Sequence, residues 1–151
     1  MILFGNVKNQ KALKGFGLPI VKLGILQGEE EVARAYRDAD ILVSASSYET
    51  LPGTLVEAQA YGCIPVSFLR GGQKDIVDHL ANGYLALYDD DIEVRAENLA
   101  EGIIWAYAML QDPMKKDLIR LRMKQNVEEK FSYESVAHKY VLLIDKLKGV
   151  G

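Results

Sequence analysis

Two glutamates, Glu49 and Glu57, frame a polar turn and are the residues best placed to do chemistry on a ligand. A carboxylate can accept hydrogen bonds from two neighbouring hydroxyl groups, as a sugar presents them. Between the two, the sequence predicts that a helix begins near Gly53 or Thr54. The start of a helix offers free backbone N–H groups and the positive end of a dipole, which suit a phosphate or a sugar hydroxyl.

The spacing of the two glutamates has plainer explanations as well. Glu93 and Glu101 repeat it elsewhere in the chain, in what reads as a surface segment. Thr54 and Glu57 fit a capping box, in which the glutamate only satisfies the start of a helix. Glu49 fits a solvated turn residue equally well. On spacing alone, structural roles are the better interpretation of both residues.

Short apolar runs that end in Gly or Ser predict buried parallel strands at residues 2–4, 20–23, 41–44, 64–68 and 84–87. Helical patterns over residues 29–38 and 54–61 lie between several of them. This alternation predicts an α/β fold with right-handed crossovers, whereas residues 6–19 read as an exposed loop. In an open parallel sheet, the turn between Glu49 and Glu57 would lie at the carboxyl edge, where ligands bind.

The last part of the chain reads as helical. A stripe of apolar residues from Leu99 to Leu110 is interrupted at Asp112-Pro113, and a second helix is predicted over about residues 114–130. Ser132 is a good N-cap for a final helix. That helix carries an apolar stripe made of Val136, Tyr140, Leu143 and Leu147.

Composition restricts the classes of function. The 151 residues suit one domain, and a net charge of −3 argues against a nucleic-acid-binding face. Cys63 with His79 and His138 is too sparse a set for a zinc site, and Cys63 is expected to be a small buried residue without a nucleophilic role. We find no signal peptide and no apolar stretch that could span a bilayer, so we expect a cytoplasmic protein.

Residues 44–66 resemble the signature of family-4-like retaining glycosyltransferases with the GT-B architecture. The matching positions are Glu49, Glu57, Ala58, Ala60, Gly62, Pro65 and Val66. The resemblance continues at Leu23-Gly24 and through residues 30–40, at the turn Gly71-Gly72, and at residues 82–85. It covers most of residues 2–147.

This resemblance implies one half of a GT-B fold: a Rossmann-like parallel sheet with flanking helices and a C-terminal helical tail. It implies that Glu57 binds the ribose hydroxyls of a UDP- or GDP-sugar donor and that Glu49, the candidate catalytic residue, lies by the donor sugar without an assigned nucleophilic role. No cofactor or metal is expected. The other substrate-binding residues that it implies are Thr50, Leu51, Pro52, Gly53, Thr54, Leu55, Gly24 and Ile25.

The sequence departs from the family pattern at three places. Leu51-Pro52-Gly53 replaces an aromatic-Gly pair and is associated with bacterial capsule and exopolysaccharide transferases, and Asp75 stands where many members have Glu. The Arg and Lys that bind the donor diphosphate are not found, because Lys14-Gly15 follows what resembles the second strand of the domain.

We therefore expect residues 1–151 to form the donor-binding domain of a hexosyl-type transferase, without its first βα unit and without the acceptor domain. Alone it should be inactive. The full-length protein would transfer a sugar to an acceptor sugar or glycolipid in polysaccharide or glycolipid biosynthesis, in the cytoplasm or at the inner face of the membrane.

Two other classes stay open. A hydrolysing nucleotide-sugar epimerase shares the architecture but would need histidines in the cleft, for which His79 is the one candidate. A non-catalytic α/β module of the receiver type would need an acidic cluster after the first strand, where Gly5-Asn6 stand instead. A dinucleotide fold is disfavoured because Gly15-Phe16-Gly17 is followed by Pro19 and no helix.

Overall fold

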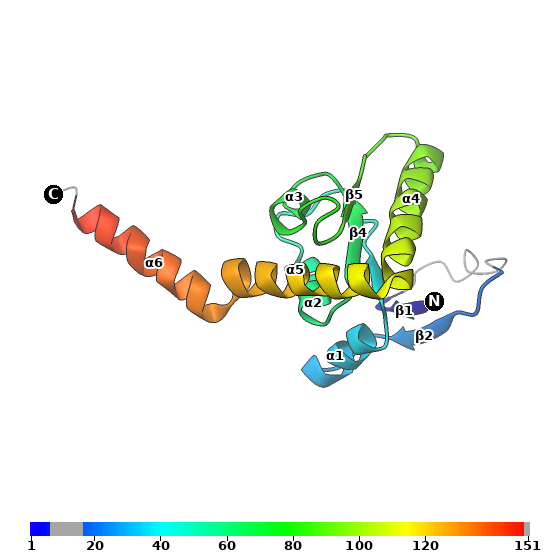
Figure 1. Ribbon diagram of the computed structural model, residues 1–151, viewed down its shortest axis with the longest axis horizontal. Coiled ribbons are helices and arrows are strands. Elements are labelled where there is room, and N and C mark those ends of the chain that lie inside the picture. Colours follow the sequence, from blue (N-terminus) through cyan, green and yellow to red (C-terminus); the bar gives the residue numbers. More distant parts are fainter. Residues whose placement is uncertain (7–16, 150–151) are drawn as a thin grey trace.

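The computed structural model describes residues 1–6 and 17–149 and alternates strands with helices (Figure 1). Strands form at all five predicted places, with ends that differ by a residue at most. The predicted burial is wrong for the strand at Val21–Gly24, which is exposed throughout because the strand at Ile2–Phe4 is its one substantial neighbour among the described residues. The elements in chain order are β1 (Ile2–Phe4), β2 (Val21–Gly24), α1 (Glu29–Arg37), β3 (Ile41–Val43), α2 (Gly53–Ala60), β4 (Ile64–Phe68), α3 (Gln73–Ile76), β5 (Tyr84–Ala86), α4 (Ile92–Gln111), α5 (Pro113–Phe131) and α6 (Tyr133–Lys148). The predicted loop at residues 6–19 lies mostly outside the described residues.

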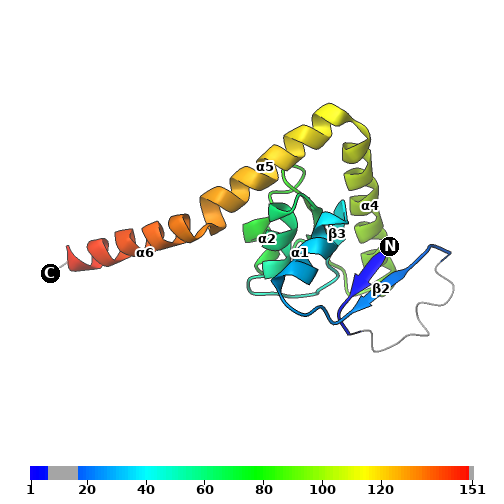
Figure 2. The same ribbon diagram turned by 90° about the horizontal axis from the view of Figure 1, so that it is seen from below.

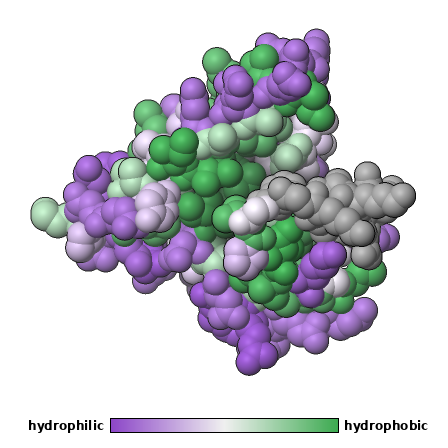
Figure 3. Space-filling model, turned by 90° about the vertical axis from the view of Figure 1, so that its right-hand side faces the viewer, coloured by the Kyte–Doolittle hydropathy of each residue, from purple (hydrophilic) through white to green (hydrophobic). Residues whose placement is uncertain are grey.

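All strands pair in parallel, as predicted, but they form two sheets. β1 pairs with β2, and β3, β4 and β5 form a second sheet in that order. Between the sheets lies a hollow of about 510 Å³ whose lining includes Ile2–Phe4 of β1 and Ile41–Val43 of β3. Figure 3 shows apolar surface on the side of the molecule where the N-terminal strands lie. The described residues therefore place the two strand edges at a common apolar hollow.

The central strand β4 is buried along its whole length, because helices cover both faces of its sheet. On one face, Ile64, Val66 and Phe68 pack with residues of α4 and α5. On the other face, Leu55 of α2 packs with Leu85 of β5. Alternate residues of a strand point to opposite faces, so Ile64, Val66 and Phe68 share one face of β4, and Pro65 and Ser67, which are also buried, share the other.

Side-chain caps fix the boundaries of the C-terminal helices. Asp112 accepts hydrogen bonds from the backbone N–H groups of Met114 and Lys115, and Pro113 occupies the first turn of α5. Ser132 accepts from Ser135 N at 3.1 Å and starts α6. Both predicted boundaries are confirmed by these contacts.

Helix α6 differs from the expectation drawn from its apolar stripe. It extends away from the rest of the molecule (Figures 1 and 2), and none of its residues is buried. The stripe is therefore exposed, because α5 is its one substantial neighbour among the described residues. No helix in the described ranges combines the length and apolarity that a membrane span requires.

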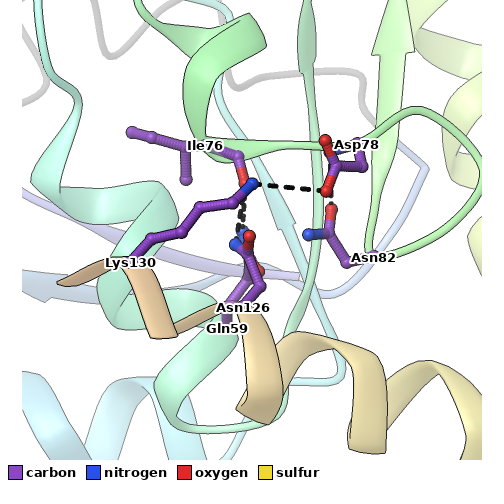
Figure 4. Close-up of polar contacts among 6 residues, drawn as sticks. All are labelled: Gln59, Ile76, Asp78, Asn82, Asn126 and Lys130. Atoms are coloured by element: carbon purple, nitrogen blue, oxygen red, sulfur yellow. Dashed lines mark hydrogen bonds and ion pairs between the residues drawn. The ribbon is translucent and has the colours of Figure 1, made fainter. Parts of the chain in front are cut away.

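A buried polar network that the sequence did not predict ties α5 to α2 (Figure 4). The Asn126 side-chain amide donates to Gln59 Oε1 and to the carbonyl oxygen of Ile76, both at 2.9 Å. Gln59 Nε2 donates to the same carbonyl at 3.2 Å. Beside these buried contacts, Lys130 and Asp78 form an exposed ion pair at 3.4 Å. The network joins α2, the end of α3 and α5 at one point.

Cys63 lies in the core next to α1. Its Sγ lies 2.9 Å from the carbonyl oxygen of Tyr36 and 3.0 Å from that of Ala39, and its side chain is fully buried. Burial, with the negative charge of Asp40, raises the pKa of the thiol to about 11. The thiol is therefore protonated at neutral pH, as suits a buried structural cysteine.

Replacement of Asn126 by Ala should destabilise the fold by about 1–3 kcal/mol, because it leaves the buried Gln59 Oε1 without its donor. Urea unfolding followed by circular dichroism measures this. Gln125→Ala, at an exposed neighbouring position on the same helix, is the matched control and should stay within about 0.5 kcal/mol of the parent chain. Equal stability of the two variants would contradict the role of the network.

Cys63 should not react with a disulfide reagent in the folded chain at pH 7.5, because the thiol is both buried and protonated. The absorbance of the thiolate that the reagent releases measures the extent of the reaction. The same chain in concentrated urea should react fully and serves as the control. Rapid labelling of the folded chain would show that the site is open.

Candidate functional site

Three loops follow the carboxyl ends of strands near the predicted ligand contacts, and the first two of these loops carry such residues. They are residues 25–28 after β2, residues 44–52 after β3 and residues 69–72 after β4. Such loops are the usual ligand-binding segments of parallel sheets. Gly24 ends β2 with φ +69°, in the left-handed region that glycine tolerates, and Ile25 is exposed.

The start of α2 has no side-chain cap. Pro52 is its N-cap and is extended, and the first turn holds no acidic residue. The capping box that the sequence allowed is therefore wrong, because Thr54 already lies inside the helix. Leu55 is a core residue whose N–H donates to Pro52 O at 3.0 Å. The start of the helix, at Gly53 and Thr54, is exposed, and its backbone N–H groups are available to a ligand.

The loop that carries Glu49 rests on the turn Gly71-Gly72. Gly72 N–H donates to the carbonyl oxygen of Glu49 at 2.7 Å. A Cβ on Gly72 would collide with the carbonyl group of Thr50, so only glycine permits this close approach. Gln73 Nε2 donates to Ser46 O at 3.1 Å and holds the beginning of the same loop. Sequence reasoning noted the glycine pair but missed that it supports Glu49.

The side chains of the loop itself differ in exposure. Glu49 is half-buried, Thr50 and Leu51 are exposed, and Pro52 is buried. Glu49 thus lies at the border between the core and solvent, three residues before Pro52, in the same loop that leads into the exposed start of α2.

Glu57 is exposed on the second turn of α2, and its Oε2 accepts a hydrogen bond from the Tyr36 hydroxyl at 3.0 Å. It lines a hollow of about 420 Å³ together with Gly28, Glu29, Val32, Ala33 and Tyr61. The structure therefore places Glu57 beside the start of α1. The predicted base-contacting pair, Gly24 and Ile25, does not line this hollow, whereas Gly28, which sequence reasoning missed, does.

The geometry suits a ligand that combines hydroxyl and phosphate groups. Glu57 supplies an exposed carboxylate, and the uncapped start of the same helix supplies N–H donors. Within the described residues no group of three or more His, Cys, Asp and Glu side chains could hold a metal ion. The larger hollow of about 510 Å³ lies between the sheets and is lined by β1, β3 and the end of α1. Tyr36 is among its lining residues, whereas Glu57 is not.

Other residues considered from the sequence have structural surroundings. His79 Nδ1 accepts a hydrogen bond from Leu85 N at 3.0 Å, and its ring packs edge-on against Tyr84. Trp105 is half-buried and packs with the same tyrosine. Asp75 is exposed on α3. Lys14 and Gly15 lie outside the described residues.

Comparisons with known proteins place the chain in a family. Residues 8–129 match the family described as glycosyl transferases group 1. An uncharacterized glycosyltransferase of Methanocaldococcus jannaschii is 30% identical over 123 residues, which are 81% of this chain and 29% of that protein.

Solved structures show the same fold. A sucrose-phosphate synthase from Thermosynechococcus elongatus has a TM-score of 0.66 and 23% identity over 87% of this chain and 31% of its own. Anabaena HepE, solved in complex with UDP and glucose, has a TM-score of 0.71 and 18% identity over 96% of this chain and 40% of its own. The chain thus spans about a third of the length of the relatives it matches. It belongs to the glycosyl transferases group 1 family and is a glycosyltransferase domain of the GT-B type.

Proposed function

We propose that this chain is the donor-binding part of a retaining, family-4-like glycosyltransferase and that its site binds a nucleoside diphosphate sugar. The observation that carries the proposal is the exposed Glu57 carboxylate on the same helix whose uncapped start is exposed at Gly53 and Thr54. A carboxylate recognises the ribose hydroxyls, and helix N–H groups recognise the diphosphate. The UDP and glucose bound in Anabaena HepE support a UDP-sugar as donor.

In this proposal, the donor sugar lies at the loop of Glu49, and the base lies against the turn that begins at Gly24 and Ile25. Thr50, Leu51 and Pro52 line the sugar and phosphate positions through their backbone. The chain supplies orientation and donors to the departing diphosphate, and no residue is assigned as a nucleophile. The full-length protein would transfer a hexose in polysaccharide or glycolipid biosynthesis of the capsule type, in the cytoplasm or at the inner face of the membrane.

We also propose that the chain works with a first βα unit and an acceptor domain outside residues 1–151. The hollow of about 510 Å³ between β1 and β3 supports this organisation, since both strands present an edge to it. Parallel neighbours lie about 4.8 Å apart in a sheet, so one added strand between the two edges would join the two sheets into one. The acceptor would bind through the missing domain.

Isothermal titration of the chain with UDP and GDP tests donor binding. We expect UDP to bind weakly and Glu57→Gln to weaken that binding about tenfold, because it removes a charge-assisted acceptor worth about 1.4 kcal/mol. Glu93→Gln is the matched control, since Glu93 precedes another glutamate at the same spacing but lies in the first turn of α4. Unchanged UDP binding by Glu57→Gln would contradict the proposal.

The chain alone should show no glycosyl transfer. Incubation with UDP-, GDP- and ADP-sugars and acceptor lipids, followed by mass spectrometry of the products, measures this. The physical reason is that a donor site without an acceptor site cannot hold both reactants in the reacting geometry. Turnover at the rate of a full-length family member would overturn the proposed division of the enzyme.

A further inference from the structure

Tyr36 reaches from α1 into the candidate site. It lies in the last turn of that helix, is 2% exposed, and its hydroxyl donates to Glu57 Oε2 at 3.0 Å. The same hydroxyl lies 3.5 Å from the carbonyl oxygen of Thr54, at the outer limit of a hydrogen bond. The single hydroxyl proton is therefore directed at the carboxylate.

The ring of Tyr36 is held in place from two sides. Phe4 packs edge-on against it, with ring centroids 6.0 Å apart, and Tyr61 stacks on it at 5.8 Å with an interplanar angle of 6°. The Tyr36 carbonyl group lies 2.9 Å from Cys63 Sγ, which anchors the backbone at this residue. The packed ring fixes the position of the Tyr36 hydroxyl. This donor therefore has little conformational freedom left to lose when a ligand binds at the site.

Glu57 has no comparable packing of its own. Its residue is exposed, and among the described residues the Tyr36 hydroxyl is the one side-chain partner of its carboxylate. A free glutamate samples several rotamers, and a ligand that needs one of them must pay for ordering the side chain. The Tyr36 hydrogen bond orders the carboxylate in advance and leaves Oε1 open.

The protonation state of Tyr36 agrees with this arrangement. Burial, with the neighbouring Glu57, raises the pKa of the phenol above its ordinary value of about 10. The hydroxyl therefore stays a neutral donor throughout the range in which Glu57 is to act as an acceptor.

From this geometry we infer that Tyr36 is a positioning residue, which sets the Glu57 carboxylate for the two ribose hydroxyls of the donor nucleotide. The inference rests on the proposed function, in which Glu57 binds the ribose. If Tyr36 only held α1 and α2 together, its loss would change the affinity for every ligand equally. If Tyr36 positions Glu57, its loss weakens only the contacts made to the ribose hydroxyls.

The test is the ribose preference of the chain, measured by titration with UDP and with 2′-deoxy-UDP and 3′-deoxy-UDP. Tyr36→Phe keeps the ring and removes the hydroxyl, and should reduce the preference for UDP about three- to tenfold while deoxy-nucleotide binding changes little. Tyr107→Phe is the matched control, because it removes a phenol hydroxyl at an exposed position on α4 that does not line the hollow of Glu57. It should keep the parent preference.

The possible results distinguish ribose binding by Glu57 from the positioning role of Tyr36. If the parent chain prefers UDP and Glu57→Ala abolishes the preference while Tyr36→Phe leaves it intact, the proposed function stands and the positioning role of Tyr36 is overturned. If the parent chain binds UDP and deoxy-UDP equally, ribose recognition by Glu57 fails, and the role of Tyr36 fails with it. In a Glu57→Ala background, Tyr36→Phe should have no further effect on the preference, and an equal additional loss there would contradict the coupling.

Discussion

The burial of one face of α2 determines where the candidate site lies. Leu55 and Ala58 pack into the core, and Gln59 is held by Asn126 of α5, so the helix has one position and one rotation about its axis. That rotation turns Glu57 outward and leaves the start of the helix exposed. The backbone N–H groups and the Cα atom of Glu57 belong to one rigid helix, so helix geometry sets their separation. The hydrogen bond from Tyr36 then orders the carboxylate.

The surrounding contacts then act on this helix from two directions. The turn Gly71-Gly72 supports the loop that leads into α2 and carries Glu49, and Tyr36 of α1 reaches the Glu57 carboxylate. The contact with the loop requires glycine at position 72, because a side chain there would collide with the loop. The contact with Glu57 requires a buried hydroxyl group on the neighbouring helix α1. A site built this way has its chemistry on one helix and its supports on the elements that pack around it.

Sequence patterns were sufficient for the strands and for every helix except the short α3, because the apolar runs of β1, β3 and β4 and the caps at Asp112 and Ser132 are local signals. The contacts that shape the site are not local. The pairing of Asn126 with Gln59 spans 67 residues, and that of Tyr36 with Glu57 spans 21. The exposure of α6 and the division of the strands into two sheets also depend on packing between elements. The apolar periodicity of a single helix or strand does not predict that packing.

A crystal structure of the chain with UDP would show whether Glu57 and the start of α2 together bind the donor nucleotide. We expect the ribose hydroxyls within hydrogen-bond distance of the Glu57 carboxylate and the diphosphate at the backbone N–H groups of Gly53 and Thr54. UDP bound elsewhere, for example in the hollow between β1 and β3, would contradict it.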